Sequence, residues 1–187
     1  MIKNRKTFFF LLFFLNSCAG SSIPSMVGNA FFSEKGFYKS IDDGLIYTKI
    51  KANILSLGLK TFGDIGIHVF NGKVLLVGNV GNSSERFKIV RKAWENDSVV
   101  KVINEIDINN DYSLIKKAKD LYLQAKINSS LLLKKKIIFN NYSIQVYRQN
   151  IYVIGISRNL EEKIEIEEFL HSFEQCDKVF NFIEINK

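Results

Sequence analysis

The sequence predicts an α+β fold in which two tandem αββαβ domains follow a signal peptide and a flexible tether. Three observations support this prediction. A basic and then apolar segment opens the chain. The remainder repeats itself at a fixed offset of 77 residues, the distance from Asp43 to Asp120. Within each repeat, apolar residues recur at helical spacing in two stretches and alternate, as in strands, in three others.

The first residues predict export, with residues 1–17 removed as a signal peptide. Lys3, Arg5 and Lys6 precede an almost unbroken apolar run from Thr7 to Leu15, which is the order found in secretory signal peptides. The run is shorter than the ~20 apolar residues that a membrane-spanning helix needs. We therefore expect it to be cleaved rather than retained.

The end of this segment, Leu15-Asn16-Ser17-Cys18, resembles the bacterial lipobox, whose cysteine is acylated and becomes the new N-terminus. Several acyl chains anchor a protein stably, whereas a single chain binds a membrane only marginally. The alternative is a signal peptide that contains a cysteine by chance. The lipobox leaves Cys176 without a disulfide partner, and a small, buried, apolar role is favoured for it.

The formal charge is +7 for the whole chain and near +4 once Lys3, Arg5 and Lys6 are removed. A mildly basic exported body is compatible with an anionic lipid surface. Export argues against DNA or RNA as a ligand, so we expect no nucleic acid partner.

Residues 18–41 are expected to form the lipidated N-terminus and a linker, because Gly, Ser and Pro are frequent there. Apolar pairs such as Phe31-Phe32 and Phe37-Tyr38 indicate that part of it lies against the folded body or the membrane. The repeat then predicts a first domain over 42–110 and a second over 113–187. Domains of this size are marginal alone, so packing of the two copies against one another is expected.

The first copy predicts its elements in the order helix, hairpin, helix, strand. Aliphatic residues recur at helical spacing between Ile46 and Leu57. Asn71-Gly72 separates two apolar runs and is the strongest short signal for a two-residue hairpin turn. The expected strands span 65–69, 74–77 and 100–108, and the second helix begins at Ser83-Ser84 and reaches Trp94.

The second copy predicts the same order. Leu123, Ile127 and Leu131 recur at helical spacing, and 179–185 alternate as its last strand. Gln149-Asn150 at its hairpin is a poorer turn pair, which predicts a weaker or longer turn. The helix over 113–133 is expected to be longer than its counterpart in the first copy.

On these residues the chain resembles the BON domain, a module of bacterial osmotically induced and nodulation-type envelope proteins. The resemblance rests on 67–78, 85–86 and 99–106 in the first copy, and on 151–155 and 178–183 in the second. The glycine after the hairpin and the valine-rich segment before the closing Asn are its clearest marks. With the lipobox and two copies, the chain is similar to the dual-BON outer-membrane lipoproteins of the DolP type.

This resemblance implies an αββαβ sandwich in each copy, binding to anionic phospholipid and support of outer-membrane integrity, without enzymatic activity. Ala19 after the cysteine is compatible with sorting to the outer membrane. The expected location is therefore the periplasmic face of that membrane, with a lipid anchor. Tyr122 matches the aromatic residue that the second-domain helix of the family presents to lipid.

No catalytic, metal or cofactor motif is found in the sequence, so we expect no enzyme, no metal and no cofactor. His68 lies on the outward phase of a strand and is expected to be solvated, and His171 is expected at the edge of the core. The two histidines and the spare cysteine are too far apart in sequence to predict a metal site. The glutamates from Glu161 to Glu168 predict a solvated helix face.

A basic and apolar stretch early in the second copy is the candidate lipid-binding surface. The expected helix is apolar on more than one side, and it is followed by three lysines and two isoleucines. Aliphatic side chains beside lysines suit the headgroup boundary, where each lysine contributes about 1 kcal/mol. The predicted lipid-binding residues are Leu121, Tyr122, Lys126, Leu132, Leu133, Lys134, Lys135, Lys136 and Ile137.

Two alternatives stay open for this surface, since it could pack on the first domain or bind a protein. The predicted function is a non-enzymatic lipoprotein whose second domain binds anionic phospholipid membranes. The alternative is a protein-interaction adaptor for an outer-membrane assembly or cell-wall machine. The first copy has Leu57-Gly58-Leu59-Lys60 at the matching place and is expected to bind lipid more weakly.

Overall fold

The computed structural model describes residues 37–58, 63–109 and 111–186. For residues 37–41, at the start of the first helix, only the backbone is described. The predicted signal peptide, the lipobox and most of the predicted linker lie outside the described residues. None of the described helices is both long enough and apolar enough to cross a membrane.

The described chain forms two αββαβ units, which confirms the predicted fold class. The first unit consists of α3 (Phe37–Leu55), β1 (Ile65–Phe70), β2 (Lys73–Val80), α5 (Ser83–Trp94) and β3 (Lys101–Ile108). The second consists of α6 (Leu114–Leu132), the 3₁₀ turn η2 (Phe139–Asn141), β4 (Tyr142–Tyr147), β5 (Asn150–Ser157), α7 (Leu160–His171) and β6 (Lys178–Ile185).

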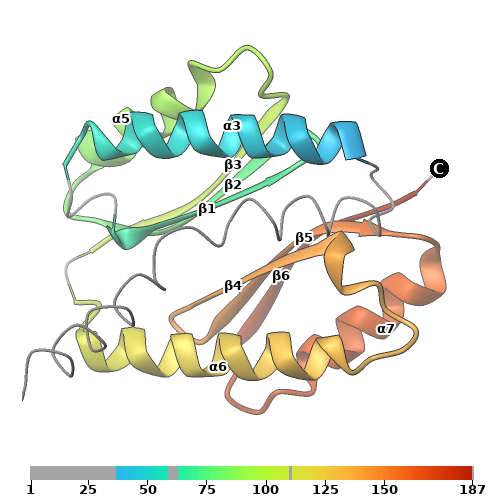
Figure 1. The fold of residues 1–187 in the computed structure, drawn as a ribbon. Helices are drawn as coiled ribbons and strands as arrows, with labels where there is room; N and C mark the ends of the chain where they lie inside the picture. The colour runs from blue at the N-terminus through green and yellow to red at the C-terminus, as the bar shows by residue number, and fades with distance from the viewer. Residues whose placement is uncertain (1–36, 59–62, 110, 187) are drawn as a thin grey trace, which may run out of the picture.

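Each unit contains a three-stranded sheet with the same topology. In the first sheet β2 is central, antiparallel to β1 and parallel to β3, and in the second β5 takes the same place between β4 and β6. Two helices cover one face of each sheet, and the other faces of the two sheets meet (Figure 1). The molecule is therefore a stack of four layers, with α3 and α5 on one outside and α6 and α7 on the other.

The central strands are buried on both faces, which explains their continuous apolar runs. On β2, Val74 and Leu76 pack into the core under α3 and α5, whereas Leu75 and Val77 face the second unit. The two sheets thus share a third apolar cluster, in which the Tyr152 ring stacks on Phe180 at 4.6 Å between ring centroids. This cluster confirms that the two copies pack on one another.

One aspartate in each unit holds the hairpin turn, which explains why it recurs at the repeat offset. The Asp43 carboxylate accepts hydrogen bonds from the backbone N–H groups of Asn71 and Gly72, both at 2.9 Å. Asp120 accepts in the same way from Arg148 at 2.5 Å and Gln149 at 3.0 Å. The first helix of each unit is thereby fixed to the tip of its own hairpin.

The glycine after each hairpin is required by a close backbone approach. A Cβ atom on Gly78, which has φ of +148°, would lie 2.0 Å from the carbonyl oxygen of Asp64. A Cβ on Gly155 would lie 2.2 Å from the carbonyl oxygen of Asn141. Any side chain at these positions would push the antiparallel strands apart.

The elements differ from the sequence predictions at three points. The first helix starts at Phe37, inside the predicted linker, and α3 and α6 have the same length of 19 residues, so α6 is not the longer helix. The second hairpin turn uses Arg148 and Gln149 and is as short as the first. Both residues have positive φ, 50° and 60°, because the Asp120 carboxylate binds their N–H groups and holds a turn that their side chains do not favour.

His68 is not solvated as predicted, because the outward face of β1 meets the second sheet. Its Nδ1 lies 2.7 Å from Ser143 Oγ and its Nε2 3.1 Å from Gln145 Oε1. Burial lowers the pKa of His68, although the hydrogen bond with Gln145 opposes the shift. His68 and Gln145 occupy equivalent positions in the two units, so the sheets meet like the halves of a two-fold pair.

One further prediction fails, and two hold in part. His171 is exposed at the end of α7 rather than at the edge of the core. Cys176 packs against the second core as predicted, but it is only partly buried. Glu162 does not belong to the solvated face of α7, because it is buried and paired with Arg158. Glu161 and Glu168 are exposed, as predicted for that face.

Candidate functional site

The inner face of α6 fixes this helix to the second sheet. Ser113 caps its first turn, and the Ser113 hydroxyl accepts a hydrogen bond from the Lys116 N–H. The buried residues of α6 recur every three or four positions, as one face of a helix must. They are Asp120, Leu123, Ile127 and Leu131, and the three apolar ones belong to the second core.

The opposite face of α6 carries a second apolar stripe that points into solvent. At 3.6 residues per turn, its members fall on the side of the helix away from the core. Tyr122 is 74% exposed. The stripe consists of Leu114, Ile115, Ala118, Leu121, Tyr122, Ala125 and Leu132. We call these seven residues the outer stripe.

Exposure of the outer stripe excludes the alternative that it packs on the first domain. The first unit meets the second through the sheets, and α6 reaches it mainly through Lys117. The Lys117 ammonium donates to Gly63 O at 3.0 Å and pairs with Asp64 Oδ1 at 3.2 Å. The apolar side chains of the outer stripe thus remain available to another molecule.

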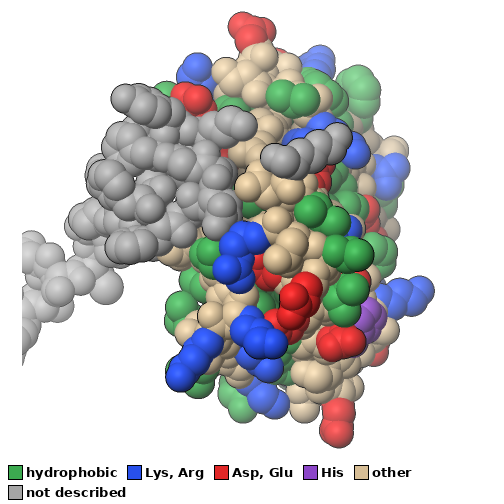
Figure 2. Space-filling model, turned by 90° about the vertical axis from the view of Figure 1, so that its right-hand side faces the viewer, with side chains coloured by type: hydrophobic (Ala, Val, Ile, Leu, Met, Phe, Trp, Pro, Cys, Tyr) green, Lys and Arg blue, Asp and Glu red, His purple; other side chains and the backbone are tan. Residues whose placement is uncertain are grey.

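Lysines surround the outer stripe and follow its C-terminal end. Lys119 and Lys126 are exposed on α6, and Lys134, Lys135 and Lys136 are exposed in the loop after it. Leu133 opens that loop and is 83% exposed. Figure 2 views the molecule from the side of this loop and shows Lys and Arg side chains gathered in the lower left part of that face.

Two of these lysines are held against aromatic rings of the second core. The Lys126 ammonium lies 5.8 Å from the centroid of Phe173, and that of Lys134 lies 5.2 Å from the centroid of Phe169. A cation over a ring at this range is stabilised by about 0.5–1 kcal/mol at an exposed site. Both charges therefore have a preferred position at the surface.

Buried Glu162 fixes the backbone of the lysine loop. Its carboxylate accepts from the N–H of Ile138 at 3.0 Å and from the N–H and Nε of Arg158, both at 2.9 Å. The Arg158 guanidinium also donates to Lys136 O at 2.5 Å. Burial alone would raise the pKa of Glu162, but these hydrogen bonds and the Arg158 charge lower it, so the carboxylate stays ionised.

One predicted site residue is corrected by the structure. Ile137 is 5% exposed and packs in the second core with Leu131 and Phe173. The loop turns inward after Lys136 because Ile138 binds Glu162, so Ile137 cannot reach lipid. The other eight predicted residues, Leu121, Tyr122, Lys126, Leu132, Leu133, Lys134, Lys135 and Lys136, are all exposed on one helix and its loop.

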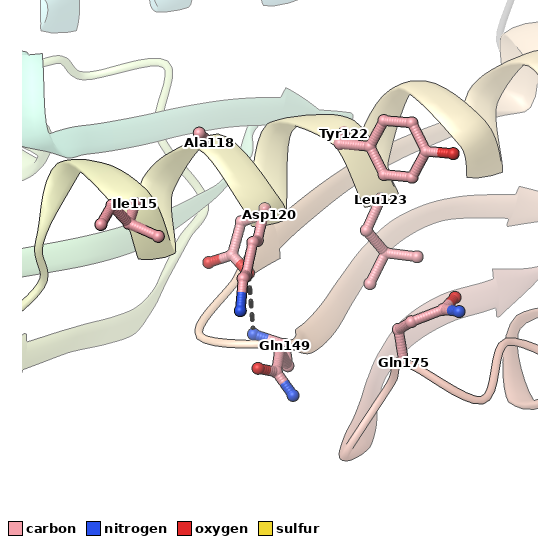
Figure 3. A pocket seen from close by; sticks show the side chains of 8 residues that line it. Ile115, Ala118, Asp120, Tyr122, Leu123, Gln149 and Gln175 are labelled. Carbon is pink, nitrogen blue, oxygen red and sulfur yellow. Dashed lines mark hydrogen bonds between the residues drawn. The ribbon is translucent and has the colours of Figure 1, made fainter.

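A groove of about 600 Å³ runs beside the outer stripe, between α6, the β4–β5 turn and the loop before β6. Figure 3 shows Ile115, Ala118 and Tyr122 along its helical side, with Gln149 and Gln175 across from them. The sequence prediction missed Leu114, Ile115 and Ala118. Their spacing from Leu121 and Tyr122 along the helix would have revealed them.

The described part of the matching face of the first unit is mixed. Leu45 and Leu55 are exposed on α3 where the second unit has Tyr122 and Leu132, but Gly44 and Thr48 stand in place of Leu121 and Ala125. Leu59 and Lys60 of the predicted first-unit counterpart lie outside the described residues.

The described residues show no arrangement for metal chemistry. Within 37–58, 63–109 and 111–186, no group of three or more His, Cys, Asp or Glu side chains could hold a metal ion. The arrangement that the chain does offer is an exposed apolar helix face with fixed positive charges beside it.

Comparison with known proteins identifies the family. The model of the BON domain matches residues 42–110, the first unit. The chain is also 33% identical over 123 residues to an uncharacterized protein in the gshII 5′ region of Anaplasma centrale, an alignment that spans 65% of this chain and 80% of that protein. Residues 42–110 therefore belong to the BON-domain family.

Two solved structures are similar at low identity, and both are of CdsD, a structural protein of the Type III secretion system of Chlamydia trachomatis. Its C-terminal domain matches with 14% identity and a TM-score of 0.29, over 75% of this chain and 96% of that chain. The second structure matches with 12% identity and a TM-score of 0.29, over 75% and 92% of the two chains.

Proposed function

We propose that this protein is an outer-membrane lipoprotein with two BON domains, anchored through Cys18, whose second domain binds anionic phospholipid. Support for a second BON domain comes from the equal order of elements and the same hairpin aspartate and glycine in both units. The lipobox-like sequence supports the anchor and the location.

The observation that carries the proposal is the exposed outer stripe of α6 next to fixed lysines. Exposed apolar side chains at the end of a helix enter the acyl boundary, while lysines bind the phosphates above it. Tyr122 suits this depth, because its ring is apolar and its hydroxyl prefers water. The acidic outer face of α7 would be repelled by the same lipids, so α6 and the lysine loop, not α7, form the contact.

Vesicle co-sedimentation tests the proposal with residues 19–187, which contain both complete cores. Binding is expected to vesicles with added phosphatidylglycerol, to weaken with salt, and to be absent from neutral vesicles. Changing Lys134, Lys135 and Lys136 together to Glu removes three attractions of about 1 kcal/mol each. The apparent affinity should then fall by a factor of at least about 100.

A matched variant controls for net charge. Lys49, Lys101 and Lys178 are exposed and lie outside the outer stripe and its loop, so changing all three to Glu gives the same total charge. This control should retain most of the binding. Equal losses in both triple variants would refute a localised site, and binding that ignores lipid charge would favour the protein-adaptor alternative.

A further inference from the structure

The outer faces of α5 and α7 carry opposite charges at equivalent positions of the two units. Lys88 and Arg91 are exposed on α5, and the residues 77 positions later are Glu165 and Glu168 on α7. Ser84 of α5 likewise corresponds to the exposed Glu161 of α7. The two helices have the same length of 12 residues and the same Asn cap, so these charges occupy matching places.

The inversion is confined to side chains that point away from the unit. At the position where each helix binds its own sheet, the charge has the same sign in both units. There Arg86 reaches Ile106 O at 3.5 Å and Lys163 donates to Ile183 O at 3.0 Å. The demands of the fold therefore do not account for the opposite charges of the outer faces.

Each charged face surrounds exposed apolar side chains. On α5, Phe87 is 67% exposed, and Trp94, the last residue of the helix, is exposed as well. On α7 the corresponding apolar residues are Ile164, at the position of Phe87, and Leu160 near the start of the helix, and both are exposed. Arg91 pairs with Glu95 of the same helix at 4.0 Å. Lys88, Glu165 and Glu168 have no ion-pair partner among the residues that the structure describes.

We infer that the α5 face of one molecule binds the α7 face of a second copy of this chain. Basic and aromatic residues on one side then meet acidic and aliphatic residues on the other, which is the complementarity that favours specific association. Within one molecule the two helices lie in opposite outer layers (Figure 1). A contact of this kind is therefore heterologous, and it links molecules head to tail into a row or a ring.

This inference does not depend on lipid binding, because the α5 and α7 faces do not include the outer stripe or the lysine loop. The outer stripe of α6 would stay free in every molecule of such a row. A membrane is the other conceivable occupant of the basic α5 face, and the experiment below distinguishes it.

Photo-crosslinking of the full chain tests the contact. Two differently tagged copies are produced together in a bacterium, with p-benzoylphenylalanine in place of Trp94 at the edge of the α5 face. Illumination should give a dimer that carries both tags, with the label attached to residues 160–171 of the second copy. The same label in place of Leu114, on the opposite outer layer, should give no such dimer.

Charge exchange then tests complementarity. Lys88→Glu with Arg91→Glu makes both faces acidic and should lower the dimer yield at least tenfold, and so should Glu165→Lys with Glu168→Lys, which makes both basic. All four substitutions together exchange the two charges without altering the net charge, and they should restore the yield to within about twofold. Thermal unfolding of each variant checks that these surface changes leave the fold intact.

The inference would be overturned by a dimer yield that ignores either reversal, by failure of the fourfold exchange to restore it, or by attachment to another protein or to lipid alone. Self-association should persist when Lys134, Lys135 and Lys136 are changed to Glu. Loss of vesicle binding with intact dimers would separate the two surfaces.

Discussion

Replacing Glu162 with Gln removes the charge from the carboxylate that fixes the lysine loop. Three N–H donors point at this buried side chain, and an amide offers one oxygen and turns its own N–H₂ toward the remaining donors. One or two charge-assisted hydrogen bonds of about 1.5–3 kcal/mol each are lost. The free energy of unfolding should therefore fall by about 2–4 kcal/mol, and the melting temperature by roughly 5–15 °C.

The equivalent residue of the first unit provides the matched control. Glu85 also follows an Asn cap, but it is only partly buried and accepts from Gly81 N–H at 3.1 Å and the Asn82 amide at 3.2 Å. Among the described residues it forms no ion pair with an arginine, unlike Glu162. Glu85→Gln should cost less than about 1 kcal/mol. Urea unfolding of the two variants, followed by circular dichroism, measures the difference directly.

The pH dependence of the free energy of unfolding provides a second test of Glu162→Gln. Because the pKa of Glu162 is lower in the folded than in the unfolded state, its ionised form adds stability above the ordinary glutamate value of about 4.3. That stability is lost as the pH falls through the lower folded value. Glu162→Gln should flatten the stability profile on the acid side. Equal stabilities of the Glu162→Gln and Glu85→Gln proteins at pH 7, with parallel acid profiles, would refute the role assigned to Glu162.

Three further substitutions test the account of the fold. Burial lowers the pKa of His68, so its neutral form fits the folded state, and the unaltered protein should lose stability as the pH falls below about 6.5. His68→Gln should remove this loss. Urea midpoints of both proteins at pH 7.5 and 5.5 measure the difference. Gly155→Ala should destabilise the second unit by more than about 2 kcal/mol, since its Cβ would lie 2.2 Å from a carbonyl oxygen, whereas Gly63→Ala, with nothing within 4 Å of the added Cβ, should not. Asp120→Asn should cost about 1–3 kcal/mol, because the amide keeps only one of the two oxygens that accept from the turn. Calorimetry of the variant checks it.

The repeat made most of the fold predictable. The fixed offset located equivalent residues in both units, and the periodicity of apolar residues gave the order of helices and strands. What the offset could not give was the contact between the units. Continuous apolar runs such as Val74 to Val77 fit either a strand buried on both faces or ordinary core residues, and only the structure shows that the sheets meet back to back.

The failures at His68, Ile137 and Glu162 share one physical cause. Each residue has a polarity or a neighbourhood that suits the surface, but tertiary contacts far away in the sequence bury it. His68 forms hydrogen bonds with Ser143 and Gln145, and Ile137 packs in the second core. Arg158 and the Ile138 N–H both bind the ionised Glu162 carboxylate. Local patterns do not contain these partners. The outer stripe of α6 was partly predictable, because helical spacing alone separates it from the buried face.

Fluorescence from position 122 tests the central claim, that the outer face of α6 enters lipid. The chain contains a single tryptophan, Trp94 on α5, so Trp94→Phe with Tyr122→Trp moves the reporter to the outer stripe. With phosphatidylglycerol vesicles, the account predicts a blue shift of its emission and quenching by brominated acyl chains. Trp94 in the unaltered chain should show neither. Emission from position 122 that ignores the vesicles, or a shift at Trp94 instead, would contradict the account.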